Sequence, residues 1–300
     1  VIGNGTRQAD MYAVATTVPT ALYILFAGGA LNSVLVPQLT RAAKHDSDGG
    51  EAYTNRIITA FLMILLVVTL VVTVAAPVVT GLYSADSWRA PGLEAHYRSM
   101  VLLTMVCLPE IFFYGMFVVL GQVLNARDKF GPMMWAPIAS NLIQVGSFVA
   151  FLIVWGKSSG SDPFTGGQIL MLGGGYLVGM ILQAGVMVWA LHKVGYHYRP
   201  RFDLKGTGLG KTFKLTGWAI GFVLVNQLAL IVVSRLATSA TAGGSGAGLT
   251  VYNNAYLVFL LPHSLITVSL ATAMVTSASK LAAVGDLTGT AKEVLRTMRL

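Results

Sequence analysis

The residues of this sequence with the means to do chemistry are charged side chains inside long apolar runs. Glu110 is the sole acid well inside such a run, directly after Pro109, and Arg235 lies near the end of another. Charges at such positions are costly unless they face a bundle interior or a wet cavity. Glu110 is therefore a candidate site for a proton, a cation or a basic ligand group, and the alternative is a structural hydrogen bond. Arg235 is a candidate partner for an anionic headgroup, although snorkelling to the interface explains it equally well.

Amides inside the apolar runs form a second group of candidates, because together they could line a polar cavity. A single buried amide more often makes a helix–helix hydrogen bond, worth about 0.6 kcal/mol on average. The amides in such runs are Asn32, Gln122, Asn125, Asn141, Gln144, Asn226, Gln227, Asn253 and Asn254. We take five of them forward as substrate-cavity candidates beside Glu110 and Arg235, namely Asn32, Asn226, Gln227, Asn253 and Asn254.

Other chemistries find no support in the sequence. The stretch 206–212 resembles a phosphate-binding loop, but Lys205 stands where that pattern needs a glycine, and no strand precedes it. Cys107 is the only cysteine, which excludes an intrachain disulfide. The acidic pair Asp46 and Asp48 is better interpreted as a solvated turn than as the metal site of a transferase. We therefore predict that the protein has no enzyme active site, metal or cofactor. We expect its energy to come from an ion gradient or the membrane potential.

The elements that must position these residues are membrane spans. Charged residues make up 11% of the chain and hydrophobic ones 55%, against about 25% and 45–50% in soluble domains. A spanning helix needs roughly 20 mostly apolar residues. The sequence predicts an all-α, polytopic membrane bundle with seven spans, at about 11–40, 57–83, 99–125, 132–155, 167–191, 213–237 and 251–279.

Proline and glycine interrupt several of these spans. The first contains Pro19, Gly29 and Pro37, the third Pro109, and the last Pro262. Broken helices are tolerated where other groups satisfy the freed backbone, and they often line a transport cavity. Ordinary kinks without a role are the alternative.

The basic residues predict the orientation of the spans. The net charge is +8, but the cations lie between the apolar runs and form no face for nucleic acid. Fifteen of the 20 Lys and Arg residues fall in alternate loops, which are cytoplasmic by the positive-inside rule. These loops lie near 41–56, 126–130, 193–214 and 280–300.

Asp10 and Asn125 are expected to be structural. Asp10 begins the first span, where the helix dipole favours a carboxylate by about 0.3–1 kcal/mol, so we predict a cap. Asn125 precedes a basic turn, where its amide is able to satisfy the last carbonyls of the helix. Glu110 occupies neither kind of position, since it is predicted to lie in mid-span.

Three stretches, 3–39, 120–142 and 261–280, together resemble the MurJ/MviN family, the lipid II flippases of bacterial cell-wall synthesis. The second is the most specific, with a helix end, an Asn, a short basic turn, then Ala-Pro and Asn. The motif residues of the three stretches are Asp10, Pro19, Gly29, Pro37, Asn125, Pro137, Asn141 and Pro262. The resemblance implies a two-lobed transporter, with residues 1–205 in the N-terminal lobe and 206–300 beginning the C-terminal lobe.

The resemblance also implies a function, the outward movement of a lipid-linked peptidoglycan precursor by alternating access through a cationic cavity. Its partners would be that precursor, membrane lipids and cell-wall or division proteins. The sequence departs from the pattern where well-studied members carry arginines, at Tyr23, Ile24 and Leu257, and where they carry an acid, at Gly28. Either other helices supply the cationic groups, or the substrate or its binding mode differs.

Two further functions remain open at this point. Glu110 in an apolar span also suits a cation-coupled multidrug or polysaccharide-lipid exporter of the same superfamily. A membrane scaffold that recruits cell-wall enzymes through the basic loop 193–214 belongs to another class.

Overall fold

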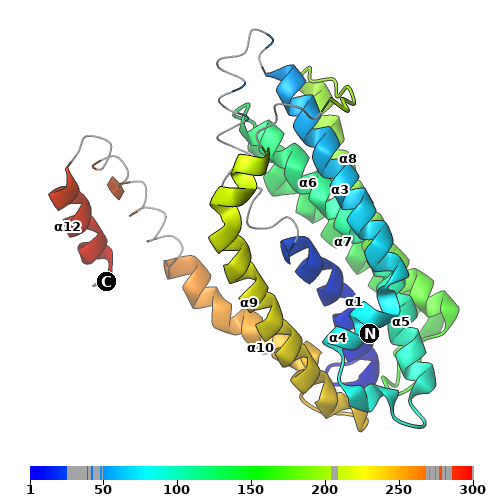
Figure 1. The fold of residues 1–300 in the computed structure, drawn as a ribbon. Coiled ribbons are helices and arrows are strands. Elements are labelled where there is room, and N and C mark those ends of the chain that lie inside the picture. The colour runs from blue at the N-terminus through cyan, green and yellow to red at the C-terminus, as the bar shows by residue number, and fades with distance from the viewer. Residues whose placement is uncertain are drawn as a thin grey trace. The chain divides into compact units, whose positions relative to one another are not determined.

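The computed structural model describes residues 1–25, 39, 42, 48, 50–203, 209–267, 270, 274, 277–278, 281 and 286–298. At 209–220, 263, 287 and 298 it describes the backbone alone. Most of the described residues are helical, with no strand among them and one isolated bridge between Thr6 and Ser245 (Figure 1). They form two compact units, residues 1–249 and 250–300.

The first unit is a bundle of membrane-length helices. Its elements are α1 (Arg7–Tyr23), α3 (Glu51–Val74), α4 (Ala76–Tyr83), the short 3-10 helix η3 (Asp86–Arg89), α5 (Glu94–Cys107), α6 (Glu110–Asn125), α7 (Gly131–Trp155), α8 (Gly166–Lys193) and α9 (Leu209–Ala242). Five helical segments within the described residues are long and apolar enough to cross a bilayer, namely Glu51–Val74, Glu94–Asn125, Gly131–Trp155, Gly166–Lys193 and Gly221–Ala242. The protein is a multi-pass membrane protein.

The predicted spans and the observed helices coincide closely, and the breaks lie beside prolines. The span predicted at 57–83 divides into α3 and α4 at Ala75, two residues before Pro77. The span predicted at 99–125 divides into α5 and α6 at Leu108 and Pro109. Proline has no N–H to donate, and its ring clashes with the carbonyl one turn earlier, so both breaks have a local cause. The first and last predicted spans are described only in part, at 11–25 and 39 and at 251–267, 270, 274 and 277–278.

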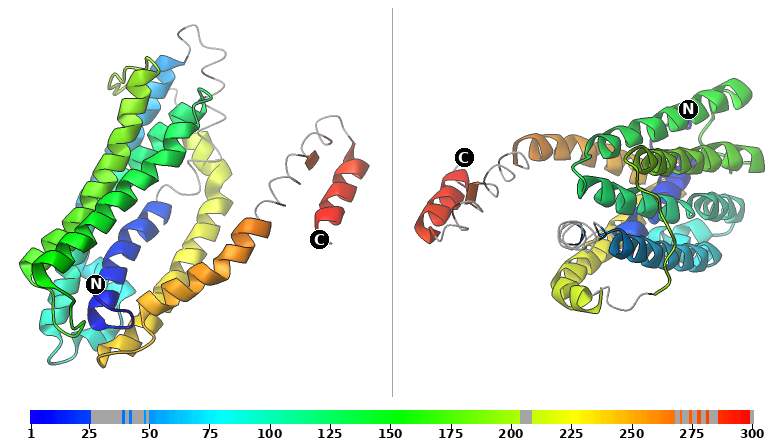
Figure 2. Two further views of the ribbon diagram at one scale, coloured as in Figure 1. Left: turned by 180° about the vertical axis from the view of Figure 1, so that it is seen from behind. Right: turned by 90° about the horizontal axis from the view of Figure 1, so that it is seen from above.

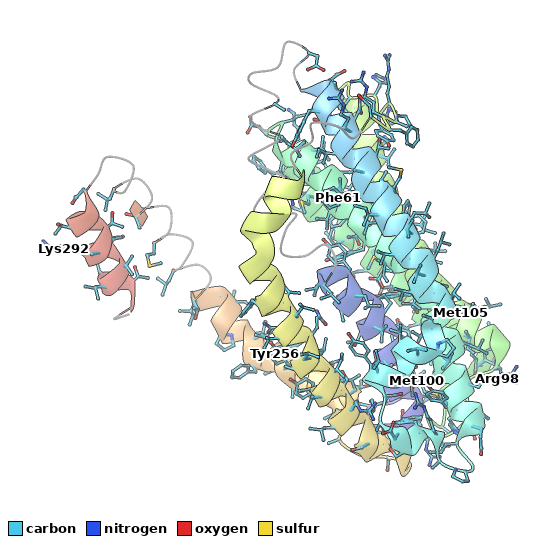
Figure 3. All side chains as sticks on the ribbon, in the orientation of Figure 1. Phe61, Arg98, Met100, Met105, Tyr256 and Lys292 are labelled. Atoms are coloured by element: carbon cyan, nitrogen blue, oxygen red, sulfur yellow. The ribbon has the colours of Figure 1, made fainter. Side chains whose placement is uncertain are left out.

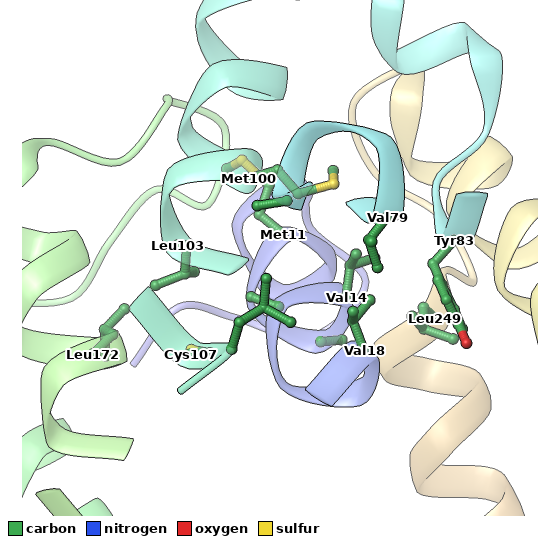
Figure 4. Close-up of a cluster of buried hydrophobic side chains, with 14 of the residues drawn as sticks. Met11, Val14, Val18, Val79, Tyr83, Met100, Leu103, Cys107, Leu172 and Leu249 are labelled. Carbon is green, nitrogen blue, oxygen red and sulfur yellow. The ribbon is translucent and has the colours of Figure 1, made fainter. Parts of the chain in front are cut away.

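α1 lies inside the first unit, where it packs against α4, α5, α6 and α9 (Figure 2). Its side chains Met11, Val14 and Val18 are fully buried. They pack together with Met100 and Leu103 of α5 in the cluster of Figure 4. The central place of α1 means that polar residues on this helix face other helices or an internal space.

The outer faces of the bundle are apolar. On α5, Met100 is fully buried whereas Met105 is 45% exposed (Figure 3). On α7, Leu142, Val145 and Val149 are exposed. Apolar side chains directed away from the bundle are what a helix needs on the side that faces lipid.

The second unit contains α10 (Leu249–Pro262), the π-helical turn η4 (His263–Thr267) and α12 (Leu287–Met298). Tyr252, Tyr256 and Phe259 stack along one face of α10. α10 ends at Pro262, and the π-helical turn follows directly. Packing divides the chain after Leu249, because α9 packs against α1, α4 and η3. The division into transporter lobes at 205 stays a prediction.

Candidate functional site

A cavity of about 320 Å³, lined by both polar and apolar side chains, lies beside α1 in the first unit. It is lined by side chains of α1, α7, α8 and α9 together with Ile24, which directly follows α1. The lining residues are Tyr12, Thr16, Thr17, Thr20, Ala21, Ile24, Gln144, Tyr176 and Leu230. A hydroxyl-bearing side chain every four residues along α1, at 12, 16 and 20, places these groups on one face of the helix.

The threonine hydroxyls of this face donate their hydrogens to the helix backbone. Thr16 Oγ1 donates to the Tyr12 carbonyl at 3.0 Å, and Thr20 Oγ1 donates to the Thr16 carbonyl at 3.3 Å. A hydroxyl has one hydrogen to donate but two lone pairs with which to accept. The oxygen of Thr16 therefore keeps its acceptor capacity, whereas the Thr20 side chain also makes a hydrogen bond with Tyr176.

Glu110 is connected to the cavity through Tyr176. The Tyr176 hydroxyl donates to Glu110 Oε1 at 3.1 Å, and the Glu110 residue is only 1% exposed. Its second oxygen, Oε2, has no hydrogen-bond partner among the residues that the structure describes. Glu110 is not itself a lining residue. Tyr176 thus joins the acid to the cavity wall.

Glu110 lies in the middle of the span Glu94–Asn125, as the sequence predicts. What the sequence did not show is that Glu110 also begins a helix, α6, because Pro109 ends the preceding helix α5. A carboxylate in the first turn of a helix is favoured by the backbone dipole. No salt bridge to Glu110 occurs in the described part of the chain. Its titratable neighbours are Tyr12, Cys107, Tyr114 and Tyr176.

Arg235 lies in a different environment from the cavity. Its guanidinium donates to the Gly81 carbonyl at 2.9 Å and to Asp86 Oδ2 at 2.6 Å. These bonds join α9 to α4 and η3, and Arg235 is not among the lining residues. The structure therefore pairs this arginine with an acid of the protein, and its predicted contact with an anionic headgroup gains no support from this arrangement.

The candidate amides are distributed over several places. Gln144 lines the cavity, and its Nε2 donates to Ser140 Oγ at 3.1 Å. Gln227 is buried on α9, three residues before the lining residue Leu230, and its Oε1 has no partner among the described residues. Asn226 is exposed and donates to the Phe222 carbonyl.

The remaining amide candidates lie elsewhere. Asn253 and Asn254 belong to α10 in the second unit, and Asn32 lies outside the described residues. The sequence reasoning missed Tyr12, Thr16, Thr17, Thr20 and Tyr176. The spacing of hydroxyl groups at 12, 16 and 20 in a charge-free span was the available signal.

Asp10 is structural in a way that differs from the prediction. The residue that caps α1 is Thr6, whose hydroxyl accepts from the Ala9 N–H at 3.1 Å. Asp10 is fully buried, and its Oδ2 accepts from Thr241 Oγ1 at 2.6 Å and from the Leu249 N–H at 2.9 Å. It therefore fastens α1 to the turn that follows α9.

Asn125 also differs from its predicted role at the end of α6. Its amide nitrogen lies 3.3 Å from Gln122 Oε1 and 3.4 Å from Met133 Sδ, so it contacts side chains rather than the last carbonyls. The Gln122 carbonyl instead accepts from the Ala126 N–H, which closes the last turn of the backbone.

The other motif residues take ordinary places. Pro19 and Pro137 lie within α1 and α7, Pro262 is the last residue of α10, and Asn141 is exposed on α7. Gly29 and Pro37 lie outside the described residues. Tyr23, which the resemblance matches to a family arginine, is buried against Tyr114 with ring centroids 4.5 Å apart. Ile24 lines the cavity, so an apolar side chain stands there.

Comparison with known proteins gives one consistent result. The family described as "Lipid II flippase MurJ" matches residues 1–300. A protein of Haemophilus influenzae named "Probable lipid II flippase MurJ" is 25% identical over 81% of this chain and 46% of its own length. A protein of Vibrio cholerae with the same name is 26% identical over 93% of this chain and 51% of its own. The chain thus spans about half the length of these curated relatives.

A solved structure has the same fold. The structure titled "Lipid II flippase MurJ, inward closed conformation" matches with a TM-score of 0.65 and 20% identity, over 92% of this chain and 53% of that one. This likeness concerns the arrangement of helices only. Because the family match extends over the whole sequence, this chain belongs to the MurJ family.

Proposed function

We propose that the protein is a transporter that carries lipid II, the lipid-linked peptidoglycan precursor, across the bacterial cytoplasmic membrane by alternating access. The observation that carries this proposal is the match of residues 1–300 to the lipid II flippase family. The cavity beside α1 agrees with it, because its lining includes hydroxyl and amide groups and a headgroup needs polar surroundings that lipid does not offer. A transport role needs no catalytic group.

Contacts at one end of the bundle support the proposed orientation. Loops near 41–56, 126–130 and 193–214 are proposed to be cytoplasmic, and described parts of all three meet. Arg56 forms an ion pair with Asp203 at 2.5 Å, and the Tyr196 hydroxyl donates to Asn55 at 2.6 Å. Arg127 lies over the Tyr196 ring, 4.3 Å from its centroid. The hydrogen bond from Arg56 lowers the pKa of Asp203.

The loops proposed to face outward meet each other as well. Gln8 Nε2 donates to the Asp162 carbonyl at 3.0 Å, which joins the beginning of the chain to the loop between α7 and α8. The Gly246 N–H donates to the Gly5 carbonyl at 3.0 Å, which adds the turn after α9. Loops on opposite sides of a bilayer are too far apart for such bonds, so both sets are internally consistent.

The energy source and the partners belong to the same proposal. We infer coupling to an ion gradient or to the membrane potential, with Glu110 as the group that would respond to a proton or cation. Its burial and its oxygen without a partner among the described residues support this choice. Binding of cell-wall or division proteins stays a prediction, and the basic loop 193–214 is the candidate surface for it.

Depletion of the full-length protein in its host tests the function. Lipid II should accumulate in the inner leaflet, measured by its accessibility to an enzyme or probe confined to the outside, and the wall should fail. Restoration of the wild-type gene is the control. Normal outward flux in depleted cells would overturn the proposal, and dispensability except in the presence of a drug would favour a multidrug exporter instead.

A further inference from the structure

We propose that the Tyr176 hydroxyl is the path by which a proton passes between the cavity beside α1 and Glu110, which makes Glu110 a proton-binding site and not a metal site. This inference rests on the proposed function, and it specifies how transport is coupled to an ion gradient. It follows from a chain of three hydrogen-bonded side chains, Thr20, Tyr176 and Glu110, that leads from the cavity to the buried acid.

Three helices each contribute one member of this chain. The Tyr176 hydroxyl of α8 donates to Glu110 Oε1 of α6 at 3.1 Å, and the Thr20 side chain of α1 makes a hydrogen bond with Tyr176. Because the Tyr176 hydrogen is donated to Glu110, its oxygen accepts the bond from Thr20 with a lone pair. The Thr20 hydrogen is thus shared between Tyr176 and the Thr16 carbonyl. Hydroxyl groups that both accept and donate are able to pass a proton along such a chain.

Glu110 has no direct contact with the cavity. It is 1% exposed, it is not a lining residue, and its neighbours Leu108 and Ile111 are fully buried. The cavity, of about 320 Å³, has room for water, since one molecule occupies roughly 30 Å³ of the liquid, and its hydroxyl and amide groups offer polar partners. Tyr176 is the lining residue that is hydrogen-bonded to Glu110, so a proton carried by such water reaches the acid through it.

The surroundings of Glu110 favour a proton as its partner. None of the titratable side chains near it is a cation. They are Tyr12 on α1, Cys107 on α5, Tyr114 on α6 and Tyr176 on α8. Helices α3 and α7 also pack against α6, and they contain no charged residue over 57–74 and 131–155. An ionised carboxylate without a cationic partner is costly in such a place, whereas a proton neutralises it.

A metal cation would find too few ligands at this place. Calcium and magnesium take about six or more oxygen ligands. The hydrogen bonds of the described chain bring one oxygen to the Glu110 carboxyl group, that of Tyr176. No group of three or more His, Cys, Asp and Glu residues able to hold a metal occurs among the described residues. A proton on the carboxyl group needs no such set of ligands.

The transfer leaves the numbers of protons and bonds balanced. A hydronium ion in the cavity gives a proton to the Tyr176 oxygen, either directly or through Thr20, and becomes water. At the same time the hydrogen of Tyr176 leaves its oxygen and forms an O–H bond with the carboxylate of Glu110, which becomes neutral. The reverse sequence returns the proton to the cavity. Binding and release at different stages of alternating access would couple transport to a proton gradient.

Infrared spectroscopy of the full-length protein in nanodiscs tests this path. A protonated carboxyl group has a C=O stretching band that a carboxylate lacks, and the difference between wild type and Glu110→Gln isolates the band of Glu110. In D₂O this band moves to lower frequency as O–H becomes O–D. Its time course therefore measures the rate at which Glu110 exchanges its proton.

Two tyrosine variants separate the path from general effects on the bundle. Tyr176→Phe removes the hydroxyl that contacts Glu110 and retains the ring. Tyr114→Phe is the matched control, because Tyr114 is also near Glu110. The Tyr114 hydroxyl makes no hydrogen bond to Glu110 within the described chain, and Tyr114 does not line the cavity.

Wild type should show the Glu110 band within a wide pH range, with an intensity that grows as the pH falls. Exchange should be about tenfold slower in Tyr176→Phe, because the proton must then cross apolar surroundings, and unchanged in Tyr114→Phe. Absence of the band at every pH would overturn the proton site, and equal rates for Tyr176→Phe and wild type would overturn the path.

A second pair of variants serves if Tyr176→Phe melts more than a few degrees below wild type. Thr20→Val removes the bond to Tyr176 and should also slow the exchange. Thr104→Val is its control, because the Thr104 hydroxyl makes the same kind of bond to its own helix, to the Met100 carbonyl at 2.8 Å, but does not line the cavity. Equal exchange rates in this pair would overturn the path as well.

Failure of the proton path and failure of the proposed function give different results. A wild-type protein that translocates lipid II while the tyrosine variants exchange the Glu110 proton equally fast loses only the path. A wild-type protein that exchanges this proton through Tyr176 but does not translocate lipid II retains the proton site and contradicts the transport proposal.

Discussion

At the scale of single residues, two buried acids have different surroundings. Asp10 accepts hydrogen bonds from the Thr241 hydroxyl and from the Leu249 N–H, which lie before and after the turn that follows α9. Both hydrogen bonds connect α1 to that turn. Glu110 accepts one bond, from Tyr176, and its Oε2 has no partner within the described chain. The first arrangement is typical of a structural acid, whereas the second leaves capacity for a proton or a ligand.

The prediction for Glu110 concerns transport. Glu110→Gln keeps the shape of the side chain but cannot ionise, so it should impair lipid II translocation while protein levels stay near normal. Transport by reconstituted protein should be measured over a wide pH range. Wild-type transport by Glu110→Gln throughout that range would show that the residue is merely structural.

The prediction for Asp10 concerns stability. Asp10→Ala removes the acceptor of two buried donors, and each buried donor left unpaired costs about 1–3 kcal/mol. The variant should therefore have a lower melting temperature in detergent and lower levels in the membrane. Asp128→Asn is the matched control, because Asp128 is exposed at a positive φ of 58° that asparagine tolerates. Equal melting temperatures for Asp10→Ala and wild type would contradict the fastening role.

At the scale of elements, close approach of helices depends on small residues. α7 and α8 pack along much of their length. A side chain at Gly175 of α8 would meet the Oγ and Cβ of Ser147 on α7, whereas one at the adjacent Gly174 would meet open space. Helices in membranes gain stability mainly from such packing and from hydrogen bonds, because lipid is as apolar as the helices are.

This difference predicts opposite effects for two neighbouring substitutions. Gly175→Ala should lower stability, because α7 must shift and the hydrogen bond from Ser147 to the Met171 carbonyl is disturbed. Gly174→Ala should be neutral or stabilising by up to about 1 kcal/mol, since alanine is the better helix former. Thermal unfolding of both purified variants measures the difference. A larger loss for Gly174→Ala would contradict the packing described here.

At the scale of the whole molecule, the proposed orientation follows from the positive charges and from the loops that meet. The predicted cytoplasmic loops contact one another through Arg56 and Tyr196. The predicted outer loops contact one another through Gln8 and Gly246. These two networks mark the two ends of the first unit, and the end predicted to be cytoplasmic holds most of its Lys and Arg residues.

Labelling of single cysteines tests this orientation. Cys107 is fully buried and is the only cysteine of residues 1–300, so it adds little to the labelling background. In intact cells Ser161→Cys should react with a membrane-impermeant maleimide, whereas Asp128→Cys should react only after the membrane is permeabilised. The reverse pattern would show that the orientation is inverted.

The sequence by itself determined the features that depend on local composition. Apolar runs of bilayer length predict the membrane helices, and Pro77 and Pro109 have local steric effects that account for the breaks beside them. Charge counts in the loops predict an orientation through the positive-inside rule, which needs no knowledge of packing.

Only the tertiary structure decided which polar residues meet. Glu110 and Tyr176 are 66 positions apart, Asp10 and Thr241 are 231 apart, and Arg235 and Asp86 are 149 apart. The amphipathic pattern of one helix shows which of its residues share a face, but not which helix that face will contact. That is why the sequence indicated Glu110 as a candidate but did not show its link to the cavity, and why it offered a headgroup or the interface for Arg235 but not Asp86.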